Sequence, residues 1–133
     1  MPARILIIED DAAHLALVEY LLKAAGHHIF SASDGAQGAR SAREHRPDLV
    51  ICDLQMPVLN GSEVLQQLRK DPLTCEIPVV AVAAFSKTGD HSDAINAGFD
   101  GYLSKPIVPE LFVGQVEEYL PAFLLRSATR GIA

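Results

Sequence analysis

Acidic side chains end two short apolar segments of this sequence, and a lysine ends a third. Asp53 directly follows the apolar run 49–52. Glu9 and Asp10 follow a similar run near the N-terminus, and Lys105 follows the third segment. Because the carboxyl ends of parallel strands share one edge of an open α/β sheet, such strands would bring these four side chains together. We therefore expect a site for a divalent metal ion and a phosphate group.

Three carboxylates at one edge repel each other unless a cation neutralises part of their charge. Mg²⁺ suits such a place because it takes one or two carboxylates and phosphate oxygens while it keeps several waters. Asp53 could then act as a nucleophile and form an aspartyl phosphate, with Lys105 as the second cation. Pro106 would help to aim that lysine, and an X-Pro bond is the one kind for which the cis form costs little. We expect a cis bond between Lys105 and Pro106.

The segments that would position these residues have the patterns of strands. A continuous apolar run is typical of a strand that is buried on both faces. Three segments show it: Ile5–Ile8, Leu49–Cys52 and Ile77–Ala84. His27–Ala32 begins with two polar histidines and suits the edge of a sheet, and Tyr102–Ser104 is the fifth expected strand.

Between these strands, apolar residues recur at helical spacing. The expected helices cover Ala12–Ala25, a small-residue segment through Ala36–Ala42, a segment through Val64–Leu68, about Thr88–Ala97, and a last helix from Pro109. The fourth of these has few apolar residues, so it should be held least firmly. Alternating strands and helices predict an α/β protein with a doubly wound parallel sheet.

Composition narrows the classes of partner and compartment. The chain has 133 residues, which suits one domain, and its 11 basic and 17 acidic residues give a net charge of −6. This charge, without any run of lysine or arginine, argues against nucleic acid or an anionic membrane as the main partner. Cys52 and Cys75 match no zinc or redox motif, so we expect reduced thiols. With no signal-peptide pattern and no long apolar stretch, a soluble cytoplasmic protein is expected.

Taken together, these motifs resemble the receiver domain of two-component response regulators. The resemblance covers about residues 3 to 120, and it rests on Glu9-Asp10, on 53–57 with Asn60-Gly61, and on Gly101–Pro106. It implies a flavodoxin-like (β/α)5 fold with strand order 2-1-3-4-5. The whole chain looks like a stand-alone receiver of the chemotaxis or cell-cycle phosphorelay kind. Residues 1–121 would form the receiver domain and 122–133 a C-terminal extension.

The resemblance also implies a role for each site residue. Asp53 would be the phosphoacceptor, and Lys105 would pair with the phosphoryl group. Glu9, Asp10 and Asp53 would bind Mg²⁺ through their side chains, and Gln55 would bind it through its backbone carbonyl.

Two further positions concern the switch between the resting and the active state. Tyr102 matches the aromatic residue of the family that swings inward on phosphorylation. Ala83 stands where the family usually has a threonine or serine whose hydroxyl bonds the phosphoryl group, so this sequence departs from the pattern. Small residues there leave space, so the ring of Tyr102 is expected to rest inward even without phosphate.

The leading hypothesis is a single-domain response regulator that takes its phosphoryl group from a histidine kinase or a phosphotransfer protein. It would signal by contact with a downstream protein rather than act as an enzyme. The alternative is a degenerate receiver that serves as an interaction module independent of phosphorylation. A flavin-binding or phosphohydrolase domain is disfavoured, because residues 53–55 lack a second acid and no phosphate-binding loop follows the first strand. The apolar segment Phe123–Leu125 suggests a homodimer or partner contact.

Overall fold

A parallel sheet forms the centre of the computed structural model, which describes residues 3–54, 60–84, 95 and 97–120. The sheet has five strands in the order β2-β1-β3-β4-β5, and all neighbours are parallel. The strands are β1 (Arg4–Ile8), β2 (His28–Ala32), β3 (Leu49–Asp53), β4 (Val79–Ala84) and β5 (Gly101–Lys105). This order confirms the expected flavodoxin-like arrangement, with β2 at the predicted edge.

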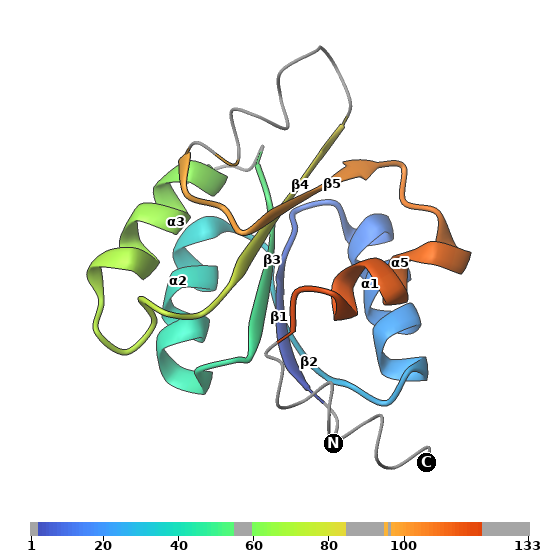
Figure 1. Cartoon of the computed structure of the whole chain (residues 1–133), viewed down its shortest axis with the longest axis horizontal. Helices are drawn as coiled ribbons and strands as arrows, with labels where there is room; N and C mark the ends of the chain where they lie inside the picture. The colour runs from blue at the N-terminus through green and yellow to red at the C-terminus, as the bar shows by residue number, and fades with distance from the viewer. Residues whose placement is uncertain (1–2, 55–59, 85–94, 96, 121–133) are drawn as a thin grey trace.

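Helices cover both faces of the sheet, as the doubly wound prediction requires (Figure 1). Helices α1 and α5 lie on one face, and α2 and α3 lie on the other. Their bounds are α1 (Ala12–Ala24), α2 (Gly35–His45), α3 (Gly61–Lys70) and α5 (Pro109–Glu117). The helix expected over about Thr88–Ala97 lies almost wholly outside the described residues, as does the C-terminal extension. No helix in the described part of the chain is long and apolar enough to span a bilayer.

Side chains at the helix starts satisfy backbone amides that the helices leave open. Asp11 caps α1 by accepting from the amides of Ala13 and His14. Asn60 begins α3 with a capping box shared with Glu63. These caps fix where α1 and α3 begin.

The core is divided by the sheet into two apolar clusters. All five residues of β3 are buried, and the four apolar ones alternate between the clusters. Leu49 and Ile51 belong to the cluster under α1 and α5, which includes the fully buried Phe112. Val50 and Cys52 belong to the cluster under α2 and α3. Because both faces of β3 are packed, its position and that of Asp53 at its end are firmly set.

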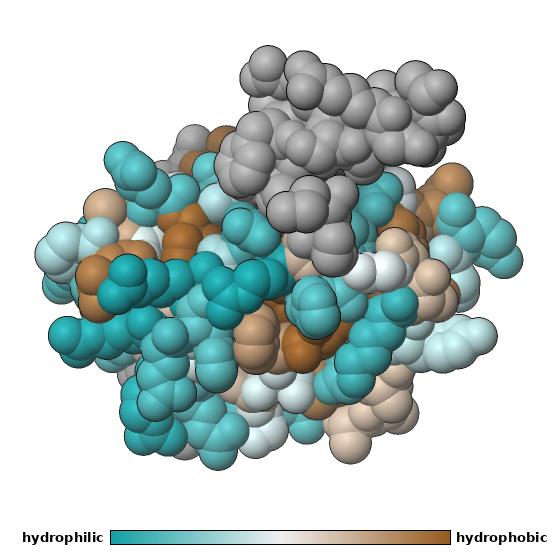
Figure 2. Space-filling view, turned by 90° about the horizontal axis from the view of Figure 1, so that it is seen from below, coloured by the Kyte–Doolittle hydropathy of each residue, from teal (hydrophilic) through white to brown (hydrophobic). Residues whose placement is uncertain are grey.

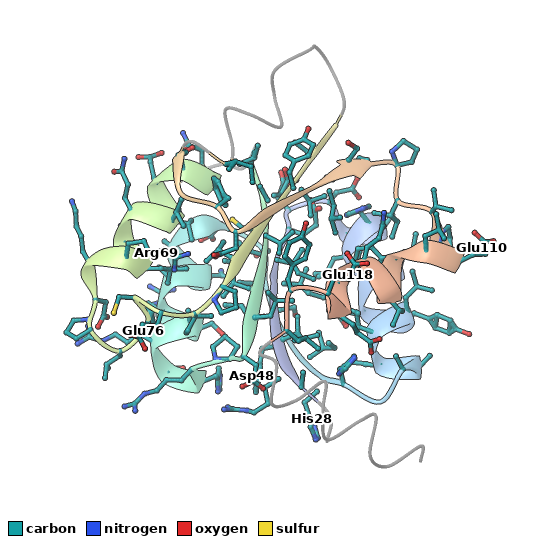
Figure 3. The ribbon with its side chains drawn as sticks, viewed as in Figure 1. His28, Asp48, Arg69, Glu76, Glu110 and Glu118 are labelled. Atoms are coloured by element: carbon teal, nitrogen blue, oxygen red, sulfur yellow. The ribbon has the colours of Figure 1, made fainter. Side chains whose placement is uncertain are left out.

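Polar contacts of Arg69 tie α3 to the sheet. Arg69 donates to the carbonyls of Cys75 and Ile77 and to the carboxylate of Asp100 (Figure 3). The Asp100 carboxylate also accepts from the amide of Val79, the first residue of β4.

At the amino ends of the strands the described surface is mostly hydrophilic, with small apolar spots (Figure 2).

His27 differs from the expectation that it is a polar residue of an edge strand. Its side chain is only 7% exposed and lies just before β2. Its Nδ1 accepts the backbone amide of Ala3 at 3.0 Å, and its Nε2 lies 2.8 Å from a carboxylate oxygen of Glu117 on α5. An amide can only donate and a carboxylate can only accept, so the proton sits on Nε2. The imidazole therefore joins the start of β1 to the end of α5.

We expect His27→Leu to lower the free energy of unfolding by about 1–3 kcal/mol, because it leaves the buried amide of Ala3 without its acceptor. Urea denaturation followed by circular dichroism measures this loss. The matched control is His28→Leu, since His28 is exposed at the start of β2 (Figure 3) and should change stability by less than about 0.5 kcal/mol. Equal effects of the two substitutions would show that the hydrogen bonds of His27 add nothing to stability.

Candidate functional site

The charged residues singled out in the sequence lie at the carboxyl ends of three strands. Asp53 is the last residue of β3, Glu9 directly follows β1, and Lys105 is the last residue of β5. Residue Ile8 pairs with Cys52 in the sheet, so Glu9 and Asp53 leave neighbouring strands at the same level. The strand order thus brings the ends of β1 and β3 side by side, with β5 two strands away from β3.

Lys105 spans that gap and contacts both acids. Its Nζ lies 2.9 Å from Oδ2 of Asp53 and 3.0 Å from Oε1 of Glu9. Both carboxyl groups are buried: Asp53 is 5% exposed and Glu9 is 3% exposed. The bond from Lys105 to Pro106 is cis, as the sequence predicts.

Three carboxylates of the site are close enough to share one metal ion. Glu9, Asp10 and Asp53 each offer an oxygen, and these oxygens lie within 4.8 Å of one another. Hard oxygen ligands suit Mg²⁺, and the exposed position of Asp10 leaves room for the waters that this ion keeps. The residues present therefore fit the expected ion. Gln55, the fourth predicted ligand, lies outside the described residues.

Burial and crowding shift the proton affinities of the site. Burial raises the pKa of the Glu9 carboxyl above its ordinary value, and the neighbouring Asp53 adds to the rise, while Lys105 and the amide of Asp11 partly oppose it. For Lys105, burial lowers the pKa, but the bonds to Asp53 and Glu9 outweigh this and raise it overall. Burial also raises the pKa of the Cys52 thiol, with smaller contributions from Asp53 and Glu9. The site is therefore built for more positive charge than one lysine provides.

Glu9 is held by two further donors that the charged residues do not supply. Its Oε2 accepts the backbone amide of Asp11 at 3.1 Å, and its Oε1 lies 2.7 Å from Nδ1 of His14 on α1. The sequence analysis missed His14. The one signal for His14 in the sequence is its position in the first turn of α1, directly after the Asp11 cap, because this turn lies next to the loop after β1.

The two residues assigned to the switch are both buried. Tyr102 is 8% exposed and Ala83 is 6% exposed, and both belong to the cluster under α2 and α3, together with Phe99. Ala83 pairs with Ser104 and Ala81 pairs with Tyr102, so the tyrosine ring lies on the side of the sheet that the two alanines line. Their functional roles stay predictions.

Millimolar Mg²⁺ should raise the melting temperature of the protein, because the ion offsets the repulsion among the three carboxylates. The gain amounts to about 2.7 kcal/mol when Mg²⁺ is at 100 times its dissociation constant. The folded state raises the pKa of Glu9 above its ordinary value of 4.5. Without metal, the protein therefore loses stability as the pH rises from that ordinary value through the raised one. The gain from Mg²⁺ should therefore be larger at neutral than at mildly acidic pH. Differential scanning fluorimetry at both pH values measures it.

Glu9→Gln and Asp10→Asn should each reduce this response, and Glu9→Gln should also remove most of its pH dependence. Glu110→Gln is the matched control, because Glu110 is exposed on α5 and points away from the site (Figure 3). A melting temperature that ignores Mg²⁺ in the wild type would mean that the acids do not form a metal site.

Comparisons with known proteins agree with this geometry. The family profile described as the response regulator receiver domain matches residues 5–117. The polar-differentiation response regulator DivK of Brucella anthropi is 37% identical over 120 residues, which cover 90% of this chain and 98% of DivK.

Among solved structures, the chemotaxis response regulator CheY4 of Vibrio cholerae has a TM-score of 0.84 at 25% identity, covering 90% of this chain and all of that one. The receiver domain of a sensor histidine kinase from Pseudomonas aeruginosa has a TM-score of 0.81 at 27% identity and covers 90% of this chain and 98% of that one. That structure holds a magnesium ion coordinated in its active-site cleft. With its matched length and its strand-end acids and lysine, this chain belongs to the family of response regulator receiver domains.

Proposed function

We propose that this chain is a single-domain response regulator that accepts a phosphoryl group on Asp53 in a Mg²⁺-dependent reaction. The donor is a phosphohistidine of a histidine kinase or phosphotransfer protein, and the output is contact with a downstream protein in the cytoplasm. The chain thus acts as a switch rather than as an enzyme with its own substrate. The observation that carries the proposal is the contact of Lys105 with both Asp53 and Glu9 in a buried acidic site.

The proposed transfer uses groups of this chain in separate roles. A carboxylate oxygen of Asp53 forms the new O–P bond, the P–N bond of the donor breaks, and the histidine nitrogen keeps that electron pair and takes up a proton. A bound Mg²⁺ supplies charge neutralisation for the phosphoryl oxygens, and Glu9, Asp10 and Asp53 would hold it. Lys105 would pair with a phosphoryl oxygen, and the distance of 2.9 Å between its Nζ and Oδ2 of Asp53 supports this role.

Incubation with acetyl phosphate and Mg²⁺, followed by intact-mass measurement, tests the proposal. We expect a gain of one phosphoryl group that disappears when EDTA is present. Peptide mapping after reduction with borohydride should locate the modification at Asp53. A mass that stays unchanged with acetyl phosphate and with a phosphorylated histidine phosphotransfer domain would reject the proposal.

The second candidate is an interaction module that works without phosphorylation. The absence of a side-chain hydroxyl at Ala83 and the buried position of Tyr102 favour it, while the complete set of acids with Lys105 opposes it. An unmodified mass together with normal binding of a downstream protein would select this candidate.

Ala83→Thr should make the protein respond more strongly to phosphorylation. The added hydroxyl would bond a phosphoryl oxygen, and a hydrogen bond to a charged group contributes about 1.5–3 kcal/mol, or roughly tenfold or more in the population shift. At rest the larger side chain would occupy space beside Tyr102, so that ring should become more exposed. Tyrosine NMR shifts with and without phosphodonor report both effects.

Ala81→Thr is the matched control, because Ala81 is fully buried one pleat further from the strand end. It adds the same atoms two residues earlier in β4, further from the carboxyl edge where a phosphoryl group would lie, and overpacking there should lower stability without strengthening the response. If Ala83→Thr and wild type show the same change on phosphorylation, Ala83 is a neutral variation.

A further inference from the structure

His14 makes a close contact with a residue of the proposed metal site. Its Nδ1 lies 2.7 Å from Oε1 of Glu9, and its side chain is 16% exposed. The carboxylate of Glu9 is itself 3% exposed. The other ring nitrogen of His14, Nε2, is buried and has no hydrogen-bond partner among the described residues. The contact with Glu9 is therefore the one that orients the imidazole ring.

The direction of this hydrogen bond follows from the acceptor. An ionised carboxylate can only accept, so the proton of the bond sits on Nδ1 of His14. The same oxygen of Glu9 also accepts from Lys105 at 3.0 Å, and the second oxygen accepts the amide of Asp11 at 3.1 Å. Three donors on two oxygens fix both the position and the plane of the Glu9 carboxylate.

The three donors differ in whether they take part in the proposed phosphoryl transfer. Lys105 also contacts Asp53 and would pair with a phosphoryl oxygen, so its ammonium is shared between Glu9 and the transfer itself. The amide of Asp11 is part of the backbone at the start of α1. His14 lies on the side of Glu9 that faces α1, and nothing in the transfer requires it to move.

We infer that His14 is a positioning residue that holds the Glu9 carboxylate in the orientation needed to bind the divalent cation. The inference rests on the proposed function, because it concerns the same site. Donors that orient a metal-binding carboxylate typically change metal affinity by about 10- to 100-fold when they are removed. His14 does not touch the phosphoryl group, so it should affect how tightly the cation binds and not how fast the loaded protein reacts.

The experiment titrates Mg²⁺ by isothermal calorimetry into wild type, His14→Leu and His14→Asn. The leucine has no donor, whereas the amide nitrogen of asparagine takes nearly the position of Nδ1. We expect His14→Leu to weaken Mg²⁺ binding about 10- to 100-fold and His14→Asn to restore most of it. The rate of phosphorylation by acetyl phosphate should match wild type in all three proteins once Mg²⁺ is saturating.

His14→Ala also removes the donor, but it does not place a larger apolar group in the site. We expect it to weaken Mg²⁺ binding as much as His14→Leu does. Wild-type affinity in His14→Ala or His14→Leu would overturn the inference, as would an affinity in His14→Asn as weak as in His14→Ala. A reduced phosphorylation rate at saturating Mg²⁺ would overturn it too, since it would give His14 another role. If wild type itself neither binds Mg²⁺ nor gains a phosphoryl group, the proposed function fails and the inference with it. If the wild type binds Mg²⁺ and gains a phosphoryl group, and the His14 variants bind Mg²⁺ as tightly as the wild type, only the inference about His14 is rejected.

Discussion

Asp53→Asn should abolish phosphoryl uptake while the protein stays folded. The amide has nearly the shape of the carboxylate, so the packing of β3 is preserved, but it is neutral and a far poorer nucleophile. It also removes one of the three oxygens that gather for the metal ion. Intact-mass measurement after incubation with acetyl phosphate and Mg²⁺ should show no modified protein, and circular dichroism should show the wild-type spectrum.

Asp48→Asn is the matched control, because it makes the same change just before β3, at the opposite end of the strand (Figure 3). Asp48 accepts the amide of Arg4 at 2.9 Å and lies at the amino end of β3, whereas Lys105 lies at the carboxyl end of β5. This variant should gain the phosphoryl group as wild type does. Phosphorylation of Asp53→Asn at the wild-type level would remove Asp53 from the role of acceptor.

Phe112→Ala should lower the free energy of unfolding by about 3–5 kcal/mol, which is a large part of the stability of a domain of this size. Phe112 is fully buried between α5 and the sheet, in one cluster with Val82 and Leu103. Truncation leaves a cavity that the rigid β4 and β5 cannot fill. Urea denaturation at fixed Mg²⁺ concentration measures the change.

The adjacent residue on the same helix turn is the control for this prediction. Leu111 is 57% exposed, so Leu111→Ala should change stability by less than about 0.5 kcal/mol. The contrast between two neighbouring truncations separates burial from helix propensity, which is better for alanine in both cases. Similar losses for the two variants would show that α5 packs through another face.

The pattern of apolar residues was enough to predict the sheet and the helices α1, α2, α3 and α5, while the helix expected over about Thr88–Ala97 stays a prediction. Leu49–Cys52 is apolar without alternation because α1 and α5 cover one face of β3 and α2 and α3 cover the other. The edge position of β2 was predicted from two leading histidines, although only His28 belongs to the strand and is exposed. Strand order was not contained in these patterns, and it came from the resemblance of the site motifs to a family.

Of the site, the sequence predicted which groups meet but not what holds them. Asp53, Glu9 and Lys105 could be placed together because strand ends share an edge. His14 could not, because helical spacing says which face a residue occupies and nothing about which side chain it meets. The contact of His27 with Glu117 has the same cause, since 90 residues separate the two partners. Gln55, Phe123–Leu125 and the division after residue 121 stay predictions.

The two thiols of this protein differ in ways that make them internal reporters of its motions. Cys75 lies in the connection between α3 and β4 and is partly accessible, whereas Cys52 is fully buried in the central strand. Because burial and two nearby carboxylates raise the pKa of Cys52, its reactive thiolate is almost absent in the folded state. Alkylating reagents should therefore label Cys75 directly, but reach Cys52 only when β3 separates from its neighbours. The rate of the second labelling step measures how often the strand that carries Asp53 opens, without any added probe.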